Sequence, residues 1–353
     1  MKKVKIAIIG AGIGQKHYIA YQQLPEMYDV AAICDVDMAR AQAFVDDAHL
    51  SRITDDFDAV LADPEIELVD ICLPPHLHFD FTARAMRAGK DVICEKPLAN
   101  SVADVDRLIE ISTETGRTVF PVFQYRFGKG ISQLRALIDS GLAGRPFVAS
   151  LETHWNRGAD YYAVDWRGTW KGEQGGAILG HAIHAHDLLT FIMGPVSSVF
   201  ARVATRVNDI EVEDCAALSI TLENGALATG SVTLGGGTDT SRLRFCFAGV
   251  TAESGSDPYR PAEDEWTFTA RAPVTQDQVD AVLTKVGDPP AGQVGFAVEV
   301  FNAMRGLETA FVNIDEARRS IEFVSAVYQS AKSERPVSLP MQKDAPTYQG
   351  WWP

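Results

Sequence analysis

The segment Val4-Lys5-Ile6-Ala7-Ile8-Ile9-Gly10-Ala11-Gly12-Ile13-Gly14 joins a short apolar run to a glycine-rich loop. The apolar run predicts a buried β-strand, and a helical stretch follows the loop. In this context the backbone N–H groups of the loop and the N-terminus of the helix can bind a pyrophosphate. The third glycine comes one residue earlier than in the G-x-G-x-x-G pattern, which leaves the shape of the turn open. A tight glycine turn without a ligand is the alternative interpretation.

Short apolar runs alternate with amphipathic stretches through residues 1–120. We expect strands at residues 4–9, 30–34, 68–73, 92–94 and 118–120, and helices at 38–47, 79–88 and 102–115. This alternation is typical of βαβ units around a parallel sheet, and the near-continuous apolarity of the runs predicts a sheet that is covered on both faces. Residues 1–123 are therefore predicted to form an α/β Rossmann domain.

A different pattern, rich in strands, follows in residues 124–353. We expect helices at 131–140, 296–309 and 315–333, strands at 147–153, 198–206, 215–222, 226–234 and 243–248, and loops at 251–261 and 287–292. Glu223-Asn224-Gly225 supplies a hairpin turn. The series predicts an antiparallel meander, and thus an α+β domain with a large open, mostly antiparallel sheet, whose last helices pack back on the first domain. A length of 353 residues also favours two domains.

Composition restricts the class of protein. The chain is 46% hydrophobic and 22% charged, and no window reaches the length of a membrane span. The basic start precedes an apolar run too short for a signal peptide, and the five cysteines show no C-x-x-C spacing, so we expect a cytoplasmic protein without disulfides or a metal site. A formal charge of −15 opposes binding to nucleic acid. A neutral small molecule is the expected partner.

Asp35 ends the second expected strand, roughly twenty residues after the glycine loop. A carboxylate at this position can accept hydrogen bonds from the adenosine ribose and repel a 2′-phosphate. The sequence therefore favours NAD over NADP, although nearby Arg40 keeps NADP possible. An ordinary surface aspartate is the alternative.

Two further segments end expected strands, namely Ile71-Cys72-Leu73-Pro74-Pro75-His76-Leu77-His78 and Val92-Ile93-Cys94-Glu95-Lys96-Pro97-Leu98-Ala99. Ligands bind at the carboxyl edge of a doubly wound sheet, so Lys96 is expected to project into the cleft beside the nicotinamide. Its ammonium group can hydrogen-bond the reacting oxygen and stabilise the charge that develops there. A solvated lysine at a strand end is the alternative.

The Glu95-Lys96-Pro97 motif, with residues 74–78 before it, resembles the Gfo/Idh/MocA oxidoreductase family. Supporting matches are Gln124-Tyr125-Arg126-Phe127, the segment Gly141-Leu142-Ala143-Gly144, Asp214, Glu223-Asn224-Gly225 and Arg335-Pro336-Val337. The resemblance covers nearly the whole chain. It implies a Rossmann domain, an open sheet that often forms the oligomer interface, and reversible oxidation of sugars, inositols or their derivatives.

The resemblance and the motifs together give the expected cofactor contacts. These are Gly10, Gly12, Ile13, Gly14, Asp35, Leu73, Pro74, His78, Glu95, Lys96, Gln124, Trp166 and Arg167.

A histidine-rich segment at residues 175–187 is similar to the part of the family that handles the proton. His184 matches the family histidine and stands three residues before Asp187, which could orient its ring. Neutral His184 would act as the general base. Gly180 departs from the Asp or Asn of many relatives, and His181 could take over that contact. His181 and His184 share a helix face, which also raises a metal site, but no remote ligand is evident.

Aromatic residues and arginines gather just before the histidines, at Trp155, Arg157, Tyr161-Tyr162 and Trp166-Arg167-Gly168-Thr169-Trp170. Aromatic rings pack on sugar faces, and arginine donors meet hydroxyl groups or a carboxylate. Core packing is the alternative for Trp155 and Trp170. The expected substrate contacts are Arg126, Arg157, Tyr162, His181 and Asp187, with Lys96 and His184 as the catalytic pair.

Three functions remain open at this point. The first is an NAD-dependent dehydrogenase that acts on a secondary alcohol of a cyclic sugar or polyol. The second is a glycosidase of the same superfamily that uses bound NAD for transient oxidation. The third is a non-enzymatic sensor of sugar or NAD, since function does not follow from fold. We also expect a homodimer or homotetramer that forms through the second sheet.

Overall fold

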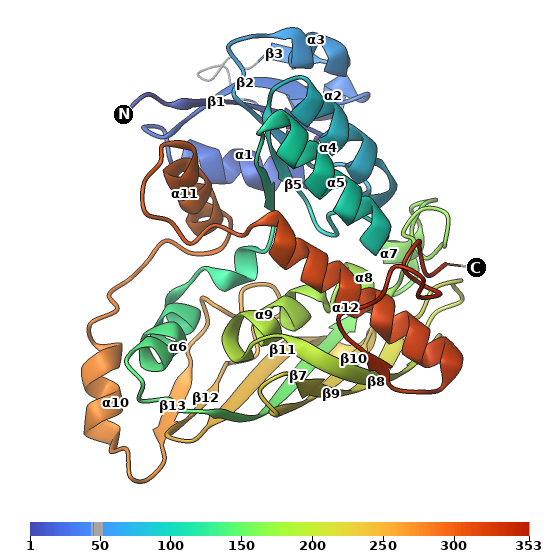
Figure 1. The fold of residues 1–353 in the computed structure, drawn as a ribbon. Helices are drawn as coiled ribbons and strands as arrows, with labels where there is room; N and C mark the ends of the chain where they lie inside the picture. The colour runs from blue at the N-terminus through green and yellow to red at the C-terminus, as the bar shows by residue number, and fades with distance from the viewer. Residues whose placement is uncertain (44, 46–51, 353) are drawn as a thin grey trace. The chain divides into compact units, whose positions relative to one another are not determined.

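The computed structural model describes residues 1–43, 45 and 52–352. Contacts divide the chain into two compact units (Figure 1). The first unit combines Met1–Val122 with Gln293–Arg318, and the second combines Phe123–Gly292 with Arg319–Pro353. Each unit has its own sheet.

The first unit contains a six-stranded sheet in the order β3-β2-β1-β4-β5-β6, and every pair of neighbouring strands is parallel. Its strands are β1 (Val4–Ile9), β2 (Tyr28–Cys34), β3 (Arg52–Thr54), β4 (Leu68–Ile71), β5 (Asp91–Cys94) and β6 (Val119–Pro121). The central strands are buried along their length, as expected where helices cover both faces of a sheet. The strand order reverses between β1 and β4, which is where ligands bind in open α/β sheets.

The first unit also contains helices, most of which connect its strands. They are α1 (Gly14–Gln22), α2 (Met38–Gln42), α3 (Phe57–Ala62), α4 (His78–Arg87), α5 (Val102–Thr115) and α11 (Gly292–Met304), with a short 3-10 helix η1 (Pro75–Leu77). The side chain of Ser101 caps the start of α5 by accepting from Asp104 N at 3.0 Å, and Gly116 ends it in the left-handed region. The helix expected at residues 38–47 ends at Gln42, and Ala43 forms a turn after it; residues 44, 46 and 47 lie outside the described residues.

The second unit contains an eight-stranded sheet in the order β13-β12-β11-β7-β10-β9-β8-β14. Its strands are β7 (Pro146–Asn156), β8 (Val196–Ala204), β9 (Cys215–Leu222), β10 (Leu227–Thr233), β11 (Gly235–Phe247), β12 (Val250–Glu253), β13 (Thr267–Ala270) and β14 (Val337–Ser338). The prediction of a mostly antiparallel sheet is confirmed, and β8, β9 and β10 form the expected meander, but β7 and β11 do not continue it. β7 pairs with β10 in parallel and separates it from β11. The long helical connection after β7 makes this arrangement possible, since only parallel neighbours need such a crossover.

One face of the second sheet is buried and the other is exposed, which follows from alternating side chains along β9 and β10. Leu218 and Ile220 are buried, whereas Ser219, Thr229 and Ser231 point outward. The helices of this part of the chain are η2 (Gln124–Arg126), α6 (Lys129–Asp139), α7 (Ala159–Tyr162), α8 (Ala177–Gly180), α9 (Ile183–Met193), α10 (Gln276–Leu283) and most of α12 (Ile314–Ser333). β12 occupies part of the expected loop at 251–261. Among the described residues, no helix is long and apolar enough to cross a membrane.

Candidate cofactor and substrate sites

Three glycines give the loop after β1 its shape. A Cβ atom at Gly10 would lie 2.4 Å from the carbonyl oxygen of Cys72, so this glycine lets the loops after β1 and β4 approach each other. A Cβ at Gly14 would lie 2.8 Å from Cγ2 of Ile8, so this glycine lets α1 pack closely on β1. A Cβ at Gly12 would meet no atom within 4 Å among the described residues. The shortened glycine spacing thus keeps the close contacts of a dinucleotide loop and leaves the Gly12 backbone accessible.

Asp35 lies beside this loop, directly after β2. Its Oδ2 accepts from Ala11 N at 2.5 Å, and its Oδ1 accepts from Asp37 N and from Nη2 of Arg40, both at 2.8 Å. Burial alone would raise the pKa of Asp35, but these hydrogen bonds and the Arg40 charge lower it. The carboxylate is therefore ionised at neutral pH, as a ribose-binding acid requires. Ile13, the other expected contact in the loop, is 38% exposed at the start of α1.

His78 connects the loops that follow β4 and β5. Its buried ring contacts the carbonyl oxygens of Pro97 at 2.6 Å and Leu73 at 2.7 Å. Burial lowers the pKa of His78, although the two carbonyls oppose this effect. The ring therefore holds together the segments that carry Leu73, Pro74 and Lys96. A direct contact between His78 and a cofactor stays a prediction.

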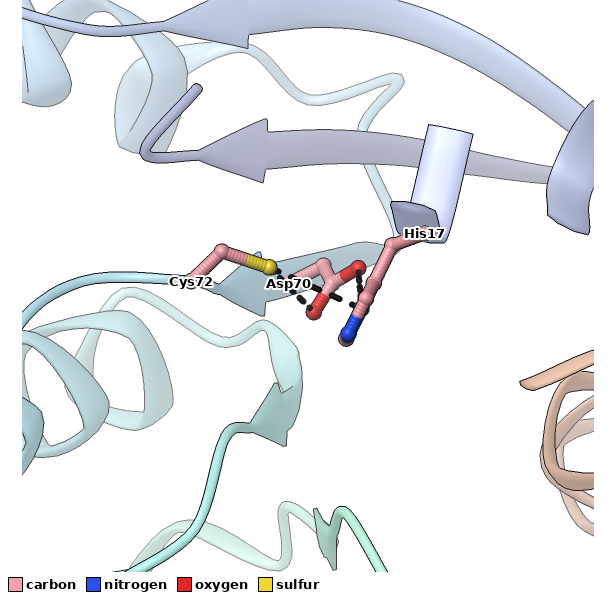
Figure 2. Close-up of side chains that lie close together, drawn as sticks. All are labelled: His17, Asp70 and Cys72. Carbon is pink, nitrogen blue, oxygen red and sulfur yellow. Dashed lines mark hydrogen bonds and ion pairs between the residues drawn. The ribbon is translucent and has the colours of Figure 1, made fainter. Parts of the chain in front are cut away.

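A buried polar cluster under these loops was missed from the sequence (Figure 2). Nδ1 of His17 on α1 lies 2.9 Å from Oδ2 of Asp70 on β4, and Sγ of Cys72 lies 3.5 Å from both side chains. Nε2 of His17 lies 3.0 Å from Oε1 of Glu95, and the hydroxyl of Tyr21 donates to Oδ2 of Asp70 at 2.8 Å. One ligand atom from each of His17, Asp70 and Cys72 lies within 4.8 Å of the others, close enough for a metal. Both ring nitrogens of His17 already contact carboxylates, so we interpret the cluster as a hydrogen-bond network.

His184 occupies the first turn of α9 in the second unit. Its buried ring stacks on Tyr125, with centroids 4.3 Å apart, and meets the edge of Phe123 at 5.9 Å. His186 lies nearby against Phe323, and burial lowers its pKa to about 3, so that it is neutral at ordinary pH. His184 and His186 thus pack against different aromatic residues. The rings of Tyr125 and Phe123 fix the plane of the His184 ring.

Asp187 and Arg126, both expected to bind substrate, form a buried ion pair. Nε of Arg126 donates to Oδ2 at 2.8 Å and Nη2 donates to Oδ1 at 2.6 Å. The guanidinium group also lies 4.6 Å from the ring centre of Phe191. This pair ties η2 to α9, the two segments that carry Tyr125 and His184. A direct substrate contact by either residue, and the orientation of His184 by Asp187, stay predictions.

An aromatic and charged cluster surrounds Arg157. Its guanidinium group lies 5.0 Å from Trp155 and 5.3 Å from Tyr161, and the ring of His181 contacts both aromatic residues. Arg157 donates to Asp239 at 2.9 Å and to the hydroxyl of Tyr259 at 2.8 Å. Asp239 and Tyr259 come from later parts of the chain and carry no motif, so the sequence did not identify them. The structure therefore brings Arg157 and His181 into one cluster.

Three other expected residues, Tyr162, Trp166 and Arg167, lie close to this cluster in sequence. Arg167 lies over the rings of Tyr161 at 3.9 Å and Trp166 at 4.7 Å, and Tyr162 contacts Tyr161.

The side-chain oxygen of Gln124 is buried and has no hydrogen-bond partner among the described residues, which suits a role in accepting a bond from a ligand. A Cβ at Gly180 would meet no described atom within 4 Å, so the chain has space for a larger side chain there.

The glycine loop, the ionised Asp35 and the strand order of the first unit define a dinucleotide-binding Rossmann domain. Comparison with known proteins agrees. Residues 4–123 match the model of an oxidoreductase family with an NAD-binding Rossmann fold, and residues 131–252 match a GFO/IDH/MocA C-terminal domain. The chain belongs to the Gfo/Idh/MocA oxidoreductase family.

The chain is similar to individual relatives at moderate identity. The chain is 30% identical over 233 residues to the uncharacterized oxidoreductase YrbE of Bacillus subtilis, a match that covers 64% of this chain and 66% of the relative. It is 34% identical over 148 residues to inositol 2-dehydrogenase of Salmonella typhimurium, covering 41% and 44%. The crystal structure of the WlbA dehydrogenase of Chromobacterium violaceum, in complex with NADH and UDP-GlcNAcA, is 27% identical, with a TM-score of 0.85 over 97% of each chain. The matches to YrbE and to inositol 2-dehydrogenase thus span only about two thirds or less of the length of those two relatives.

Proposed function

We propose that the protein is an NAD-dependent dehydrogenase that reversibly oxidises a secondary alcohol of a cyclic sugar or polyol. The observation that carries the proposal is the anchoring of Lys96 directly after β5, at the carboxyl edge of the sheet. On either side of it, Glu95 contacts His17 and Pro97 contacts His78. A lysine in this position is suited to act on a substrate oxygen at the ligand-binding edge. The similarity to an inositol dehydrogenase and to WlbA supports the substrate class.

Several of the residues described above would hold the cofactor. The loop containing Gly10, Gly12, Ile13 and Gly14 would bind the pyrophosphate through backbone N–H groups, and Asp35 would accept from the adenosine ribose. Leu73, Pro74 and the Glu95 to Lys96 peptide would line the nicotinamide end, together with Gln124, Trp166 and Arg167. When bound, NAD supplies the acceptor for the hydride that leaves the substrate carbon. Use of NADP is an alternative, which is tested by measuring activity with NAD and with NADP.

In the proposed reaction, two side chains act at one substrate oxygen. His184 takes the hydroxyl proton as the C–H bond breaks and the C=O bond forms. The Lys96 ammonium group donates a hydrogen bond to the same oxygen and stabilises the negative charge that develops on it. In the reverse direction, His184 returns the proton to the oxygen. The proton and the hydride are thus both accounted for in each direction.

The aromatic cluster favours a carbohydrate ring as substrate. Trp155 and Tyr161 offer ring faces, while Arg157 and His181 offer polar groups in the same cluster. Sugar rings present apolar C–H faces and polar edges, which match such a mixed surface. Tyr162, Arg126 and Asp187 complete the proposed substrate contacts.

We also propose that the chain forms a homodimer or homotetramer through the exposed face of the second sheet and works in the cytoplasm. The five cysteines are free, which suits a reducing compartment. Small polar side chains such as Ser219 and Thr229 cover part of the exposed face, so a sheet-to-sheet contact would be flat and partly polar. Light scattering tests the assembly, because a monomer at micromolar concentration would contradict it.

The test of the function is a spectrophotometric screen of the purified protein with NAD or NADP against hexoses, pentoses, inositols, anhydrosugars and sugar acids. The expected result is reduced cofactor with NAD and at least one cyclic polyol. If no compound is oxidised while calorimetry still shows NAD binding, the proposed activity is wrong.

A further inference from the structure

Glu95 accepts hydrogen bonds from two directions with separate oxygens. Oε1 lies 3.0 Å from Nε2 of His17, and Oε2 accepts from the backbone N–H of Lys96 at 3.0 Å. The carboxylate therefore connects α1, which starts at the glycine loop, to the peptide that carries Lys96. His17 and Glu95 are 2% and 6% exposed, so water cannot readily replace either contact.

His17 faces a carboxylate with each ring nitrogen. A neutral imidazole has one N–H group and one lone pair, so the doubly protonated ring is the form that can donate to both Asp70 and Glu95. Burial by itself lowers the pKa of His17, but the charge of Asp70 and the surrounding hydrogen bonds raise it well above the ordinary value. The other groups that face the ring are Cys72 and the amide of Gln293, which lies 3.0 Å from Nε2. The raised pKa favours the protonated ring, whose two N–H groups match the two carboxylates.

The segment around Lys96 is held at both ends. His17 holds the Glu95 side chain on one side, and His78 contacts the carbonyl oxygen of Pro97 on the other. We propose that His17 is a positioning residue, which acts through Glu95 to fix the Lys96 peptide and so the place of the Lys96 ammonium group. This inference rests on the proposed function, because that function gives Lys96 its role.

Stability alone is a poor explanation for this arrangement. Burying charged groups is costly, and well-packed apolar residues in place of a buried ion pair are often as stable or more stable. Asp70 is completely buried, and Glu95 and His17 nearly so. A network that fixes one peptide at the ligand-binding edge gives these costly groups a use, because an error of about 1 Å in a reacting group can lower a rate by about 10²-fold.

Two substitutions separate the contacts that His17 makes. The amide of His17→Asn reaches about as far as Nδ1, so it can still donate to Asp70 but loses Glu95. The amide of His17→Gln reaches about as far as Nε2, so it can still donate to Glu95 but loses Asp70. We expect kcat to fall on the order of 10²-fold in His17→Asn and much less in His17→Gln, with the Kd for NAD nearly unchanged in both.

A matched control removes a different bond from the same cluster. Tyr21→Phe deletes the hydrogen bond to Asp70 but leaves the contacts of Glu95 in place. It should lower the thermal unfolding temperature while leaving kcat unchanged. If His17→Asn does not fold, Glu95→Leu replaces it as the test. A leucine has no hydrogen-bonding atom in its side chain, so it loses the contacts with His17 and with the Lys96 N–H and should lower kcat in the same way.

An NMR measurement tests the position of the Lys96 peptide independently of enzyme activity. In protein labelled with ¹⁵N-lysine, the backbone amide signal of Lys96, assigned with Lys96→Arg, should shift in His17→Asn and stay in place in Tyr21→Phe. The inference is overturned if the signal and kcat of His17→Asn match the wild type, or if His17→Asn and His17→Gln lose kcat equally. If the signal shifts as expected but the wild-type protein oxidises no polyol, the positioning of Lys96 stands and the proposed function fails.

Discussion

Arg126 and Asp187 meet through two parallel hydrogen bonds, with side-chain exposures of only 4% and 1%. Sixty-one positions separate them in the sequence. Removing one partner leaves a buried charge without compensation. Arg126→Met should therefore lower the free energy of unfolding by about 3–5 kcal/mol. Adding Asp187→Leu should recover much of that loss, as measured by chemical denaturation.

The exposed pair of Arg202 and Glu334 provides the comparison. Their side chains are 57% and 69% exposed, and solvent screens such pairs strongly. Arg202→Ala should change stability by less than about 1 kcal/mol. Equal losses for Arg126→Met and Arg202→Ala would show that the buried pair does not stabilise the link between η2 and α9.

Asp35 should govern both the affinity for NAD and the choice of cofactor. Asp35→Ala removes a charged acceptor beside the ribose, a loss of about 1.5–3 kcal/mol, which corresponds to a roughly 10- to 100-fold higher Kd for NAD. The preference for NAD over NADP should fall as well. Asp37→Ala is the control, because Asp37 caps α2 by accepting from Arg40 N at 3.0 Å. Calorimetry that gives the two variants the same Kd would contradict the ribose contact.

His184 and His186 offer a matched pair on one helix. His184→Asn should lower kcat by about 10²- to 10⁴-fold and remove the limb of the pH profile that reports the general base. His186→Leu should leave kcat and the pH profile unchanged. The His186 ring is neutral, and its Nδ1 has no hydrogen-bond partner among the described residues. A pH profile in His184→Asn that retains the limb would assign the base to another residue.

Glu213 should make stability depend on pH. Its carboxyl group accepts from the backbone N–H groups of Gly176 and Ile178 and from the hydroxyl of Tyr328. Burial raises its pKa to about 7, against the effect of these bonds. Between the ordinary glutamate pKa and about 7, the folded state therefore binds more protons than the unfolded state. The contribution of Glu213 to stability is full below that window and decreases as pH rises through it.

Glu213→Gln isolates this effect. The wild type loses stability as pH rises through this window, whereas the variant has no group there that titrates. The free energy of unfolding of the variant minus that of the wild type should therefore be larger at about pH 8 than at about pH 5. Denaturant titrations at both pH values give the difference, in which the other titrating groups cancel. A difference that does not change with pH would show that the Glu213 pKa is not raised.

Local patterns account for the parts of the fold that the sequence predicted well. The apolar run of β1 and the helical spacing of α5 lie within single segments, so their periodicity is visible. β3 was missed because three half-exposed residues carry no apolar run. The order of β7, β10 and β11 depends on pairing between distant strands, which periodicity along one strand does not encode.

The same distinction applies to the candidate site. Lys96 and the glycine loop stand in contiguous motifs, so the sequence alone is enough to predict a role for them. His17 is a single histidine, and its partner Glu95 lies 78 residues further along the chain. The sequence around His17 therefore gives no indication of this contact. Tyr259 and Asp239 join the cluster of Arg157 only because the second sheet brings their segments together.

The central claim is that the Lys96 side chain acts on the reacting oxygen of a polyol, while the affinity for NAD depends mainly on other residues. The most direct measurement is the single-turnover rate of NAD reduction in wild type and Lys96→Ala, with the Kd for NAD from calorimetry on the same samples. We predict a rate lower by at least about 10²- to 10³-fold with a nearly unchanged Kd. A variant that reduces NAD at the wild-type rate, or that loses NAD binding to the same extent as turnover, would contradict the account.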